Sequence, residues 1–199
     1  MKVALTNLDK VFWPRVGLTK AFVVDWYVRV AHVLLPWIEG HPVTLHRFPD
    51  GVEGPHWYET RCPSHPDWLR VHRMPFRTGK VVDACVLDDV DALVWAAQAG
   101  TIELHPYLDP VDAPGVPRWV VFDLDPGPGA GGALGAARLA LRVREVLDAV
   151  GLVSAPKATG GAGLHVYAPV TGEPYERTKA FARGVAALLT REDPGWPER

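Results

Sequence analysis

Two aspartates follow a short apolar run in the middle of the chain, and this pattern constrains the fold more than any other in the sequence. The run covers residues 119–122, and Asp123 and Asp125 come before a Pro-Gly turn. The pattern predicts a buried strand on which both carboxylates share one face, while Leu124 returns to the core. Adjacent carboxylates repel each other, and a divalent metal such as Mg²⁺ or Mn²⁺ relieves that repulsion. The alternative is a solvated acidic turn.

The composition is that of an ordinary globular protein. The chain has 199 residues, 48% apolar and 22% charged, which suits a single domain with a substantial core. No apolar run approaches the roughly 18 residues that span a bilayer, and the start lacks a signal-peptide core. We therefore expect a cytoplasmic protein with no membrane partner.

The two cysteines carry little predictive weight. Cys62 and Cys85 lack the spacing of a redox pair, and we expect no disulfide framework from two cysteines. Cys62 and His65 have the spacing of half a zinc site, but no second half is evident.

The net charge of −2 conceals a partition along the chain. Residues 1–80 hold 11 basic and 7 acidic residues, residues 81–134 hold 1 and 9, and residues 135–199 hold 9 and 7. An acidic centre between basic flanks fits a metal site beside an anionic polymer, although chance can give the same distribution.

The periodicity predicts alternating helices and strands. Thr19 is the expected N-cap of a helix over 20–35 and Asp88 that of a second helix ending at Gly100. The first helix is expected to bury Phe22, Val23, Trp26, Val30, Val33 and Leu34. Strands are expected at 41–48, 69–74, 81–87, 101–106 and 152–158 and around the apolar run at 119–122, and further helices at 133–150 and 175–190.

Two basic regions near the N-terminus are candidates for contact with nucleic acid. Lys20 lies at a predicted helix start, where it can share a phosphate site with Lys10 and Asn7, or it is a solvated surface lysine. Arg47 and the adjacent pair Trp57 and Tyr58 suit base stacking and phosphate contact, although such aromatics more often cover a core edge.

Two further polar segments accompany the aspartates. The strand over 101–106 places Glu103 and His105 on one face. A glycine-rich loop at 159–163 lets backbone N–H groups approach a phosphate, with a hydroxyl from Thr159, and His165 opens the returning strand. A tight turn and a structural histidine are the alternatives for these two segments.

The order of these motifs resembles the polymerase domain of bacterial ATP-dependent DNA ligase D, in the archaeo-eukaryotic primase superfamily. The matching segments are Thr6-Asn-Leu-Asp-Lys10, Gly17-Leu-Thr-Lys20, Arg47-Phe-Pro-Asp-Gly51, Glu103-Leu-His-Pro106, Phe122-Asp-Leu-Asp-Pro126 and Gly160-Gly-Ala-Gly-Leu-His165. The resemblance implies an α/β (α+β) fold, with a primase-polymerase-like core of mixed or antiparallel sheets flanked by helices. It implies one domain over residues 1–199.

The resemblance also implies roles for individual residues. Asp123 and Asp125 would be the catalytic ligands of Mn²⁺ or Mg²⁺. The incoming nucleotide would be bound by His105, Thr159, Gly160, Gly161, Gly163 and His165. The 5′-phosphate of DNA would be bound by Asn7, Lys10 and Lys20, and the template would be contacted by Arg47, Trp57 and Tyr58.

Three departures from the family pattern are visible. Thr159 and Ala162 stand where the family usually has Ser and Lys, and Thr60 stands where a Lys follows the paired aromatics. The family's third metal carboxylate falls beyond Arg199. We therefore expect the domain to be truncated before that motif, as a fragment or as a shortened relative.

The implied function is a metal-dependent nucleotidyltransferase, a DNA-directed gap-filling polymerase that prefers NTPs, in non-homologous end joining. Its partners would be double-stranded DNA with a gap or break and a 5′-phosphate, NTP or dNTP, a Ku protein and a DNA ligase module, at the nucleoid. A catalytically inactive module that binds DNA 5′-phosphate ends is the alternative. A haloacid-dehalogenase-type phosphatase would also carry an Asp-x-Asp motif, but Pro126-Gly-Pro follows it here.

Overall fold

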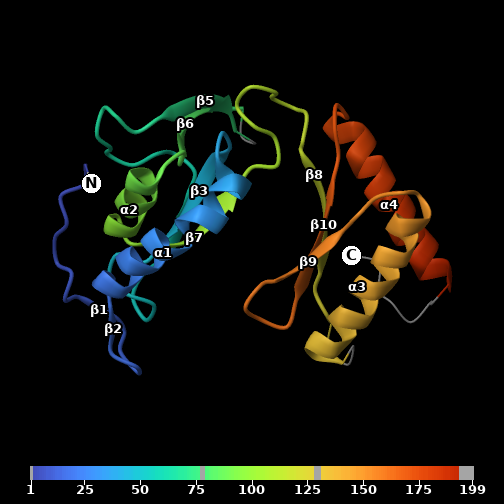
Figure 1. Cartoon of the computed structure of the whole chain (residues 1–199), viewed down its shortest axis with the longest axis horizontal. Helices are drawn as coiled ribbons and strands as arrows, with labels where there is room; N and C mark the ends of the chain where they lie inside the picture. The colour runs from blue at the N-terminus through green and yellow to red at the C-terminus, as the bar shows by residue number, and fades with distance from the viewer. Residues whose placement is uncertain (1, 77–78, 128–130, 193–199) are drawn as a thin grey trace. The chain divides into compact units, whose positions relative to one another are not determined.

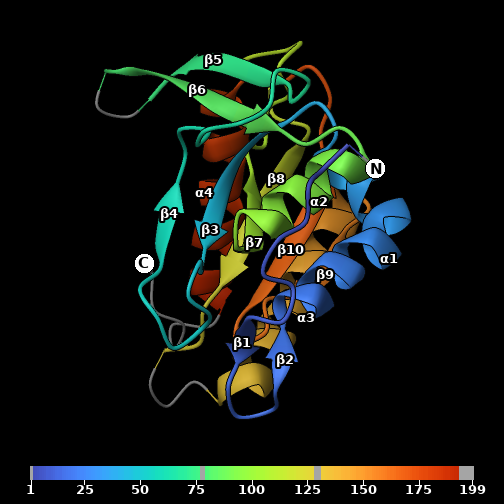
Figure 2. The same cartoon turned by 90° about the vertical axis from the view of Figure 1, so that its left-hand side faces the viewer.

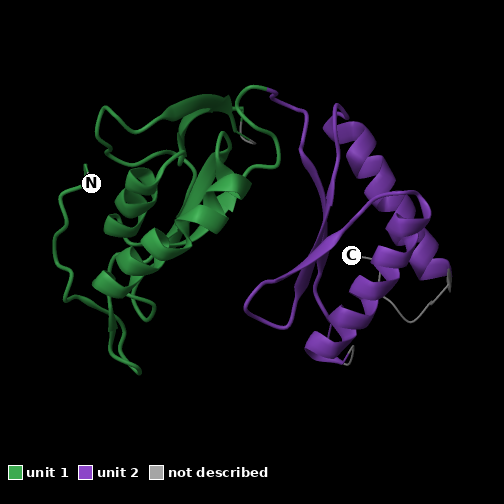
Figure 3. Cartoon of the chain, in the orientation of Figure 1, with its two compact units in different colours: residues 1–112 green, residues 113–199 purple. Residues whose placement is uncertain are grey.

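The computed structural model describes residues 2–76, 79–127 and 131–192, which form two compact units (Figure 3). Unit 1 covers residues 1–112 and unit 2 covers residues 113–199, and each has its own hydrophobic core. The mixed α+β class with antiparallel sheets is confirmed. The expectation of a single domain over 1–199 stays a prediction. Turn and loop predictions on Arg77, Thr78, 128–130 and 193–199 lie outside the described residues.

Unit 1 is built around strand β3, which pairs with three other strands. The elements of unit 1 are β1 (Val11–Trp13), β2 (Leu18–Thr19), α1 (Lys20–Ile38), β3 (Pro42–Arg47), β4 (Trp57–Glu59), β5 (Val71–Pro75), β6 (Val81–Val86), α2 (Val90–Gln98) and β7 (Thr101–Pro106). The large sheet has the order β4-β3-β6-β5, and β7 also pairs with β3. All of these pairs are antiparallel. Helices α1 and α2 lie side by side in both views (Figures 1 and 2).

The start of α1 differs from the prediction in its capping. Thr19 is the N-cap residue, but its side chain makes no capping hydrogen bond. The backbone N–H groups of Lys20 and Ala21 donate instead to the carbonyls of Lys10 and Leu8, at 2.8 and 2.9 Å. The preceding loop therefore satisfies two of the donors that a helix start leaves free.

The predicted buried face of α1 is correct only in part, because Val23 is buried and Leu34 packs against the core as expected. The buried residues are Val23, Val24, Tyr27, Ala31 and Ile38 together with Lys20, whereas Phe22, Trp26 and Val33 are exposed. The helix is apolar around most of its circumference, so periodicity could not select the face that packs. By length and composition alone, α1 could also cross a membrane, with a mean hydropathy of 1.3, which the sequence analysis did not expect. The core helix of a soluble protein can have the same length and composition.

The second helix is capped one residue later than predicted. Asp89 is the N-cap of α2, and its carboxylate accepts from the backbone N–H of Ala92 at 2.8 Å. Asp88 instead accepts from the backbone N–H of Gly40 and from the Arg70 guanidinium. Asp88 therefore ties the end of α1 to the loop before β5.

The two cysteines form a single disulfide, which their sequence spacing did not predict. Cys62 and Cys85 are bridged, with their Cα atoms 4.9 Å apart. The backbone N–H of Cys62 donates to the carbonyl of Asp83 at 2.7 Å. This bond holds the loop between β4 and β5 beside β6. The half zinc site is therefore also excluded, and Nδ1 of His65 donates to the Pro63 carbonyl.

Unit 2 is a three-stranded antiparallel sheet covered by two helices. Its elements are β8 (Trp119–Leu124), α3 (Gly132–Ala149), β9 (Ala155–Ala158), β10 (Leu164–Pro169) and α4 (Tyr175–Glu192). The strand order is β8-β10-β9, so the last strand inserts between the first two. Figure 1 shows α3 and α4 on the same side of this sheet. The core of unit 2 includes Val120, Phe122, Leu124, Val143, Leu147, Val166 and Val185.

The disulfide gives a first testable prediction. Cys62→Ala/Cys85→Ala should lower the free energy of unfolding by about 3 kcal/mol, because a loop spanning 23 residues is no longer closed in the unfolded chain. Urea denaturation measures the difference. A thiol reductant should destabilise the wild type by a similar amount and leave the double variant unchanged. Equal stability of the reduced and oxidised wild type would contradict the prediction.

Candidate active site

Asp123 at the end of β8 and Asp125, which directly follows the strand, share one face of the sheet in unit 2. Asp123 and Asp125 are exposed, while Val120, Phe122 and Leu124 are buried in the core. The alternation predicted from the sequence is thereby confirmed. The core anchors the strand through its apolar side chains, and the carboxylates are left together on the opposite face.

His165 lies directly opposite Asp123 across the β8–β10 pair. Its Nε2 atom is 3.2 Å from Oδ1 of Asp123. Its Nδ1 atom is buried and has no hydrogen-bond partner among the described residues. A buried ring nitrogen without a partner is costly, so this atom is suited to meet a polar group of a ligand.

The glycine-rich turn between β9 and β10 lies against Asp125. A Cβ atom on Gly163 would come within 2.7 Å of Oδ1 of Asp125 and 3.3 Å of the Leu124 carbonyl. The Thr159 hydroxyl donates to the Gly163 carbonyl at 2.9 Å, so it closes the turn. Gly160 has a φ of 91°, a left-handed conformation that favours glycine. The sequence therefore specifies a tight turn whose backbone reaches the acidic pair.

The donor set of the acidic pair fits a hard divalent cation. Asp123 and Asp125 offer carboxylate oxygens, which suit Mg²⁺ or Mn²⁺. Nε2 of His165 holds one of these carboxylates in place, as outer-sphere partners of metal ligands do. We find the residues present consistent with a metal held by two protein carboxylates.

Lys157 is a site residue to which the sequence analysis gave no role. It pairs in register with His165, which itself pairs with Asp123, so the three residues form one row across three strands. Residues directly opposite each other in antiparallel strands project to the same face. Its Nζ atom lies 5.6 Å from the ring centroid of Tyr167. Hairpin register fixes this position, and the sequence alone does not give the register.

The structure also brings together Asn7, Lys10 and Lys20 in unit 1. Lys20 is only 7% exposed, and its ammonium donates to the Thr6 carbonyl at 3.2 Å. Burial, and secondly the charge of Lys10, lower the pKa of Lys20 below its usual 10.5. Lys10 pairs with Asp50 at 2.5 Å. In the described part of the chain, Lys20 therefore has no carboxylate partner.

Asn7 turns the chain toward these two lysines. Its φ is 52°, in the left-handed region that asparagine tolerates better than most residues, and its carbonyl accepts from the backbone N–H of Lys10 at 3.1 Å. Since the first two N–H groups of α1 are already bonded, any phosphate here would rely mainly on the lysine side chains.

Arg47, Trp57 and Tyr58 lie together on β3 and β4 but do not form a single aromatic face. Trp57 is opposite Arg47, and Tyr58 is opposite His46, so the two rings lie on opposite faces of β4. The guanidinium of Arg47 bonds Glu59 at 2.5 Å and lies 5.5 Å from the Trp57 ring centroid. Trp57 and Tyr58 are 42% and 62% exposed.

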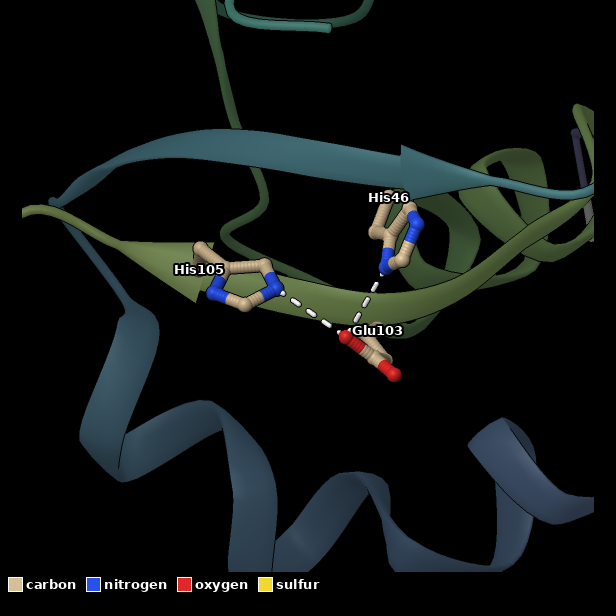
Figure 4. Close-up of side chains that lie close together, drawn as sticks. All are labelled: His46, Glu103 and His105. Carbon is tan, nitrogen blue, oxygen red and sulfur yellow. Dashed lines mark hydrogen bonds and ion pairs between the residues drawn. The ribbon is translucent and has the colours of Figure 1, made fainter. Parts of the chain in front are cut away.

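A cluster of polar side chains joins β3 and β7 in unit 1 (Figure 4). Oε2 of Glu103 accepts from Nδ1 of His46 at 2.9 Å and from Nε2 of His105 at 3.2 Å. The prediction that Glu103 and His105 share a face is confirmed. Hydrogen bonding from His46 is the main cause that lowers the pKa of Glu103. No sequence signal marked His46 as part of this cluster, because its place beside Glu103 depends on the β3–β7 pairing.

The predicted site residues thus form separate groups within the two units. In unit 2 the structure brings together Asp123, Asp125, His165 and the turn from Thr159 to Gly163, including Gly160 and Gly161. His105 belongs to unit 1, and its assignment to the nucleotide site stays a prediction.

Comparisons with known proteins show what the chain as a whole is similar to. The family described as LigD, primase-polymerase domain, matches residues 19–196. The multifunctional non-homologous end joining DNA repair protein LigD of Mycobacterium tuberculosis is 37% identical over 204 residues. The bifunctional non-homologous end joining protein LigD of Bacillus subtilis is 28% identical over 196 residues. The alignments cover 97% of this chain but 26% and 31% of these relatives, so the chain spans about a quarter to a third of their length.

A solved structure is similar to most of this chain. The polymerase domain from Mycobacterium tuberculosis ligase D, in complex with DNA, has a TM-score of 0.87 and 36% sequence identity. The match covers 97% of this chain and 70% of that chain.

The close approach of Gly163 to Asp125 gives a second prediction. Gly163→Ala should displace the Asp125 carboxylate and weaken Mn²⁺ binding about tenfold or more, since outer contacts of metal ligands have effects of this size. Titration followed by electron paramagnetic resonance measures free Mn²⁺. Gly161→Ala is the matched control, because a Cβ atom there meets nothing within 4 Å. Equal Mn²⁺ affinity of the two variants would exclude the turn from the site.

Proposed function

The chain belongs to the LigD primase-polymerase family, and from this premise we propose that it is a metal-dependent nucleotidyltransferase that fills gaps in DNA during non-homologous end joining. The observation that carries the proposal is the acidic pair of Asp123 and Asp125, which lies against a glycine-rich turn and is contacted by His165. Carboxylates beside a phosphate-binding turn are the arrangement that nucleotidyl transfer requires.

The proposed reaction joins a nucleotide to the 3′ end of a primer. The 3′-hydroxyl loses its proton to solvent and attacks the α-phosphate of an NTP. A new P–O bond forms as the bond from the α-phosphorus to the oxygen that bridges it to the β-phosphate breaks, and pyrophosphate leaves. Asp123 and Asp125 would hold Mn²⁺ or Mg²⁺, which when bound stabilises negative charge on the reacting oxygens. His165 would orient the Asp123 carboxylate through its Nε2 atom, which lies 3.2 Å from Oδ1 of Asp123.

The glycine-rich turn and Lys157 would bind the triphosphate. Backbone N–H groups of Gly160 and Gly161 can approach phosphate oxygens because neither residue has a side chain. The family usually carries a lysine where this chain has Ala162. We propose that Lys157 supplies the positive charge instead, since it shares a row with His165 and Asp123. The Thr159 hydroxyl would contribute by holding the turn closed.

DNA with a gap or break and a 5′-phosphate is the proposed polymeric partner. The similar mycobacterial domain was solved in complex with DNA. The exposed side chains of Trp57 and Tyr58 would stack on DNA bases. Arg47 would hold the Trp57 ring in position through its contact with that ring. A Ku protein and a DNA ligase module are the proposed protein partners, and the bacterial cytoplasm, at the nucleoid, is the proposed location.

The third prediction tests catalysis. Asp123→Asn/Asp125→Asn should reduce primer extension about 1,000-fold or more, because the loss of metal stabilisation is worth several kcal/mol. The assay uses a gapped duplex with a 5′-phosphate, ribonucleotides and Mn²⁺. Asp67→Asn, an exposed position in unit 1, is the matched control. Extension that survives in the double variant would remove the aspartates from the mechanism, and no extension by the wild type would refute the polymerase proposal.

The second candidate function is a module that binds DNA 5′-phosphate ends without catalysis. The specific observation in its favour is Lys20, a nearly buried ammonium beside Lys10. A buried cation without a carboxylate partner is costly unless an anion compensates it. A terminal phosphate would provide that compensation.

The fourth prediction tests this phosphate site. Lys20→Ala should reduce the preference for 5′-phosphorylated over unphosphorylated gapped DNA about tenfold or more, the value of a hydrogen bond between charged groups. Because burial lowers the pKa of Lys20 below its usual 10.5, the preference should be lost as the pH rises through that lowered pKa, since the neutral amine no longer pairs with the phosphate. Fluorescence anisotropy with both DNA forms measures it.

Two comparisons sharpen this experiment. Lys10→Ala should act in the same direction and reduce the salt dependence of binding by about one counterion. Lys80→Ala, an exposed lysine in the β5–β6 hairpin, should leave the preference intact. If Lys20→Ala lowered affinity equally for both DNA forms, the residue would not recognise the phosphate.

A further inference from the structure

We propose that His46, Glu103 and His105 form a binding site for a divalent transition-metal ion of the zinc class. The site shares no residue with the acidic pair of unit 2 and does not rest on the proposed function. It gives His105 the role of a metal ligand in place of the nucleotide contact that the family resemblance implies. It lies on one face of the paired strands β3 and β7, where the three side chains point toward one another (Figure 4).

The ligand atoms are already close to the spacing that a zinc ion requires. Nδ1 of His46 and Nε2 of His105 lie 2.9 and 3.2 Å from Oε2 of Glu103, and all three atoms lie within 4.8 Å of one another. Tetrahedral ligands at 2.0–2.1 Å from zinc are about 3.3 Å apart. Small side-chain rotations are enough to reach this geometry, because Glu103 and His105 are half exposed.

An outer shell holds His46 in the orientation that the site needs. Its Nε2 atom is 2.9 Å from Nδ1 of His56, and its ring stacks on Tyr58 with centroids 4.0 Å apart. Phe48 packs on both histidine rings, at centroid distances of 4.3 and 4.8 Å. Metal-binding histidines usually bond a partner through the second ring nitrogen, and His56 is that partner here.

The ligand set selects the class of ion. Two imidazoles and one carboxylate suit Zn²⁺ and related transition metals, whereas Mg²⁺ prefers oxygen ligands and retains its waters. The ion would take the place of the protons on Nδ1 of His46 and Nε2 of His105 that bond Glu103. His46 would then carry its proton on Nε2 and donate it to Nδ1 of His56. Three protein ligands leave at least one coordination position for water. The half-exposed Glu103 and His105 give an ion access from solvent.

Metal titration of the full chain tests the proposal. Zn²⁺ alone, followed by calorimetry at pH 7.5, should bind at one tight site per chain, and Co²⁺ should give visible absorption bands that Zn²⁺ removes. Glu103→Gln and His105→Gln should each weaken Zn²⁺ binding tenfold or more. Both side chains are about half exposed, so circular dichroism should show retained folding. His56→Gln should also weaken Zn²⁺ binding, because it removes the hydrogen bond that orients His46.

Two control variants separate this site from other ligands. His65→Gln changes an exposed histidine of unit 1 outside the cluster, and Asp123→Asn/Asp125→Asn removes the acidic pair of unit 2. Both should retain the tight Zn²⁺ site. No tight binding by the wild type would overturn the proposal and leave the cluster as a hydrogen-bonded network only. Unchanged binding in Glu103→Gln and His105→Gln, or loss in the Asp123/Asp125 variant, would also overturn it.

Discussion

The pairing of β8 with β10 is the constraint on which the candidate active site depends. It places His165 opposite Asp123 and brings the glycine-rich turn against Asp125. A slip of one residue would move His165 to the helix-covered face, because strand side chains alternate. Val166 and Ala168 are buried in the same core as the apolar side of β8, so the hydrophobic packing fixes this register. The polar site is therefore specified by residues that take no part in its chemistry.

Strand β3 has the corresponding role in unit 1. One edge is shared by β4 and β6, and the other pairs with β7. Val43 and Leu45 on this strand are fully buried, while His46 is buried between polar partners. The buried histidine is tolerated because both ring nitrogens have hydrogen-bond partners, in Glu103 and His56. Strand pairing again determines which polar residues meet.

The sequence predicted local features well and distant contacts poorly. Alternation along β8 correctly placed Asp123 and Asp125 on one face, because periodicity is a local property. The same method misplaced half of the expected buried residues of α1 (Phe22, Trp26 and Val33), because apolar residues surround most of the helix and only tertiary packing selects the buried side. The Cys62–Cys85 bridge and the position of Lys157 were missed for another reason. Both depend on which segments pair, and in what register, across a turn or loop.

The two groups of possible metal ligands differ in chemistry, and this difference sets how each would respond to ions. Exposed carboxylates such as Asp123 and Asp125 bind hard cations, but they also bind divalent transition metals. The affinity of most ligand sets for these metals rises from Mn²⁺ to Cu²⁺. The imidazoles of His46 and His105 add nitrogen donors that Mg²⁺ binds poorly. In a solution that contains both Mg²⁺ and a transition metal, the aspartate pair and the histidine cluster would therefore bind different ions. Abundant Mg²⁺ can occupy Asp123 and Asp125 without competing for His46 and His105. A transition-metal ion bound at the histidines can therefore be present at the same time as Mg²⁺ at the aspartates.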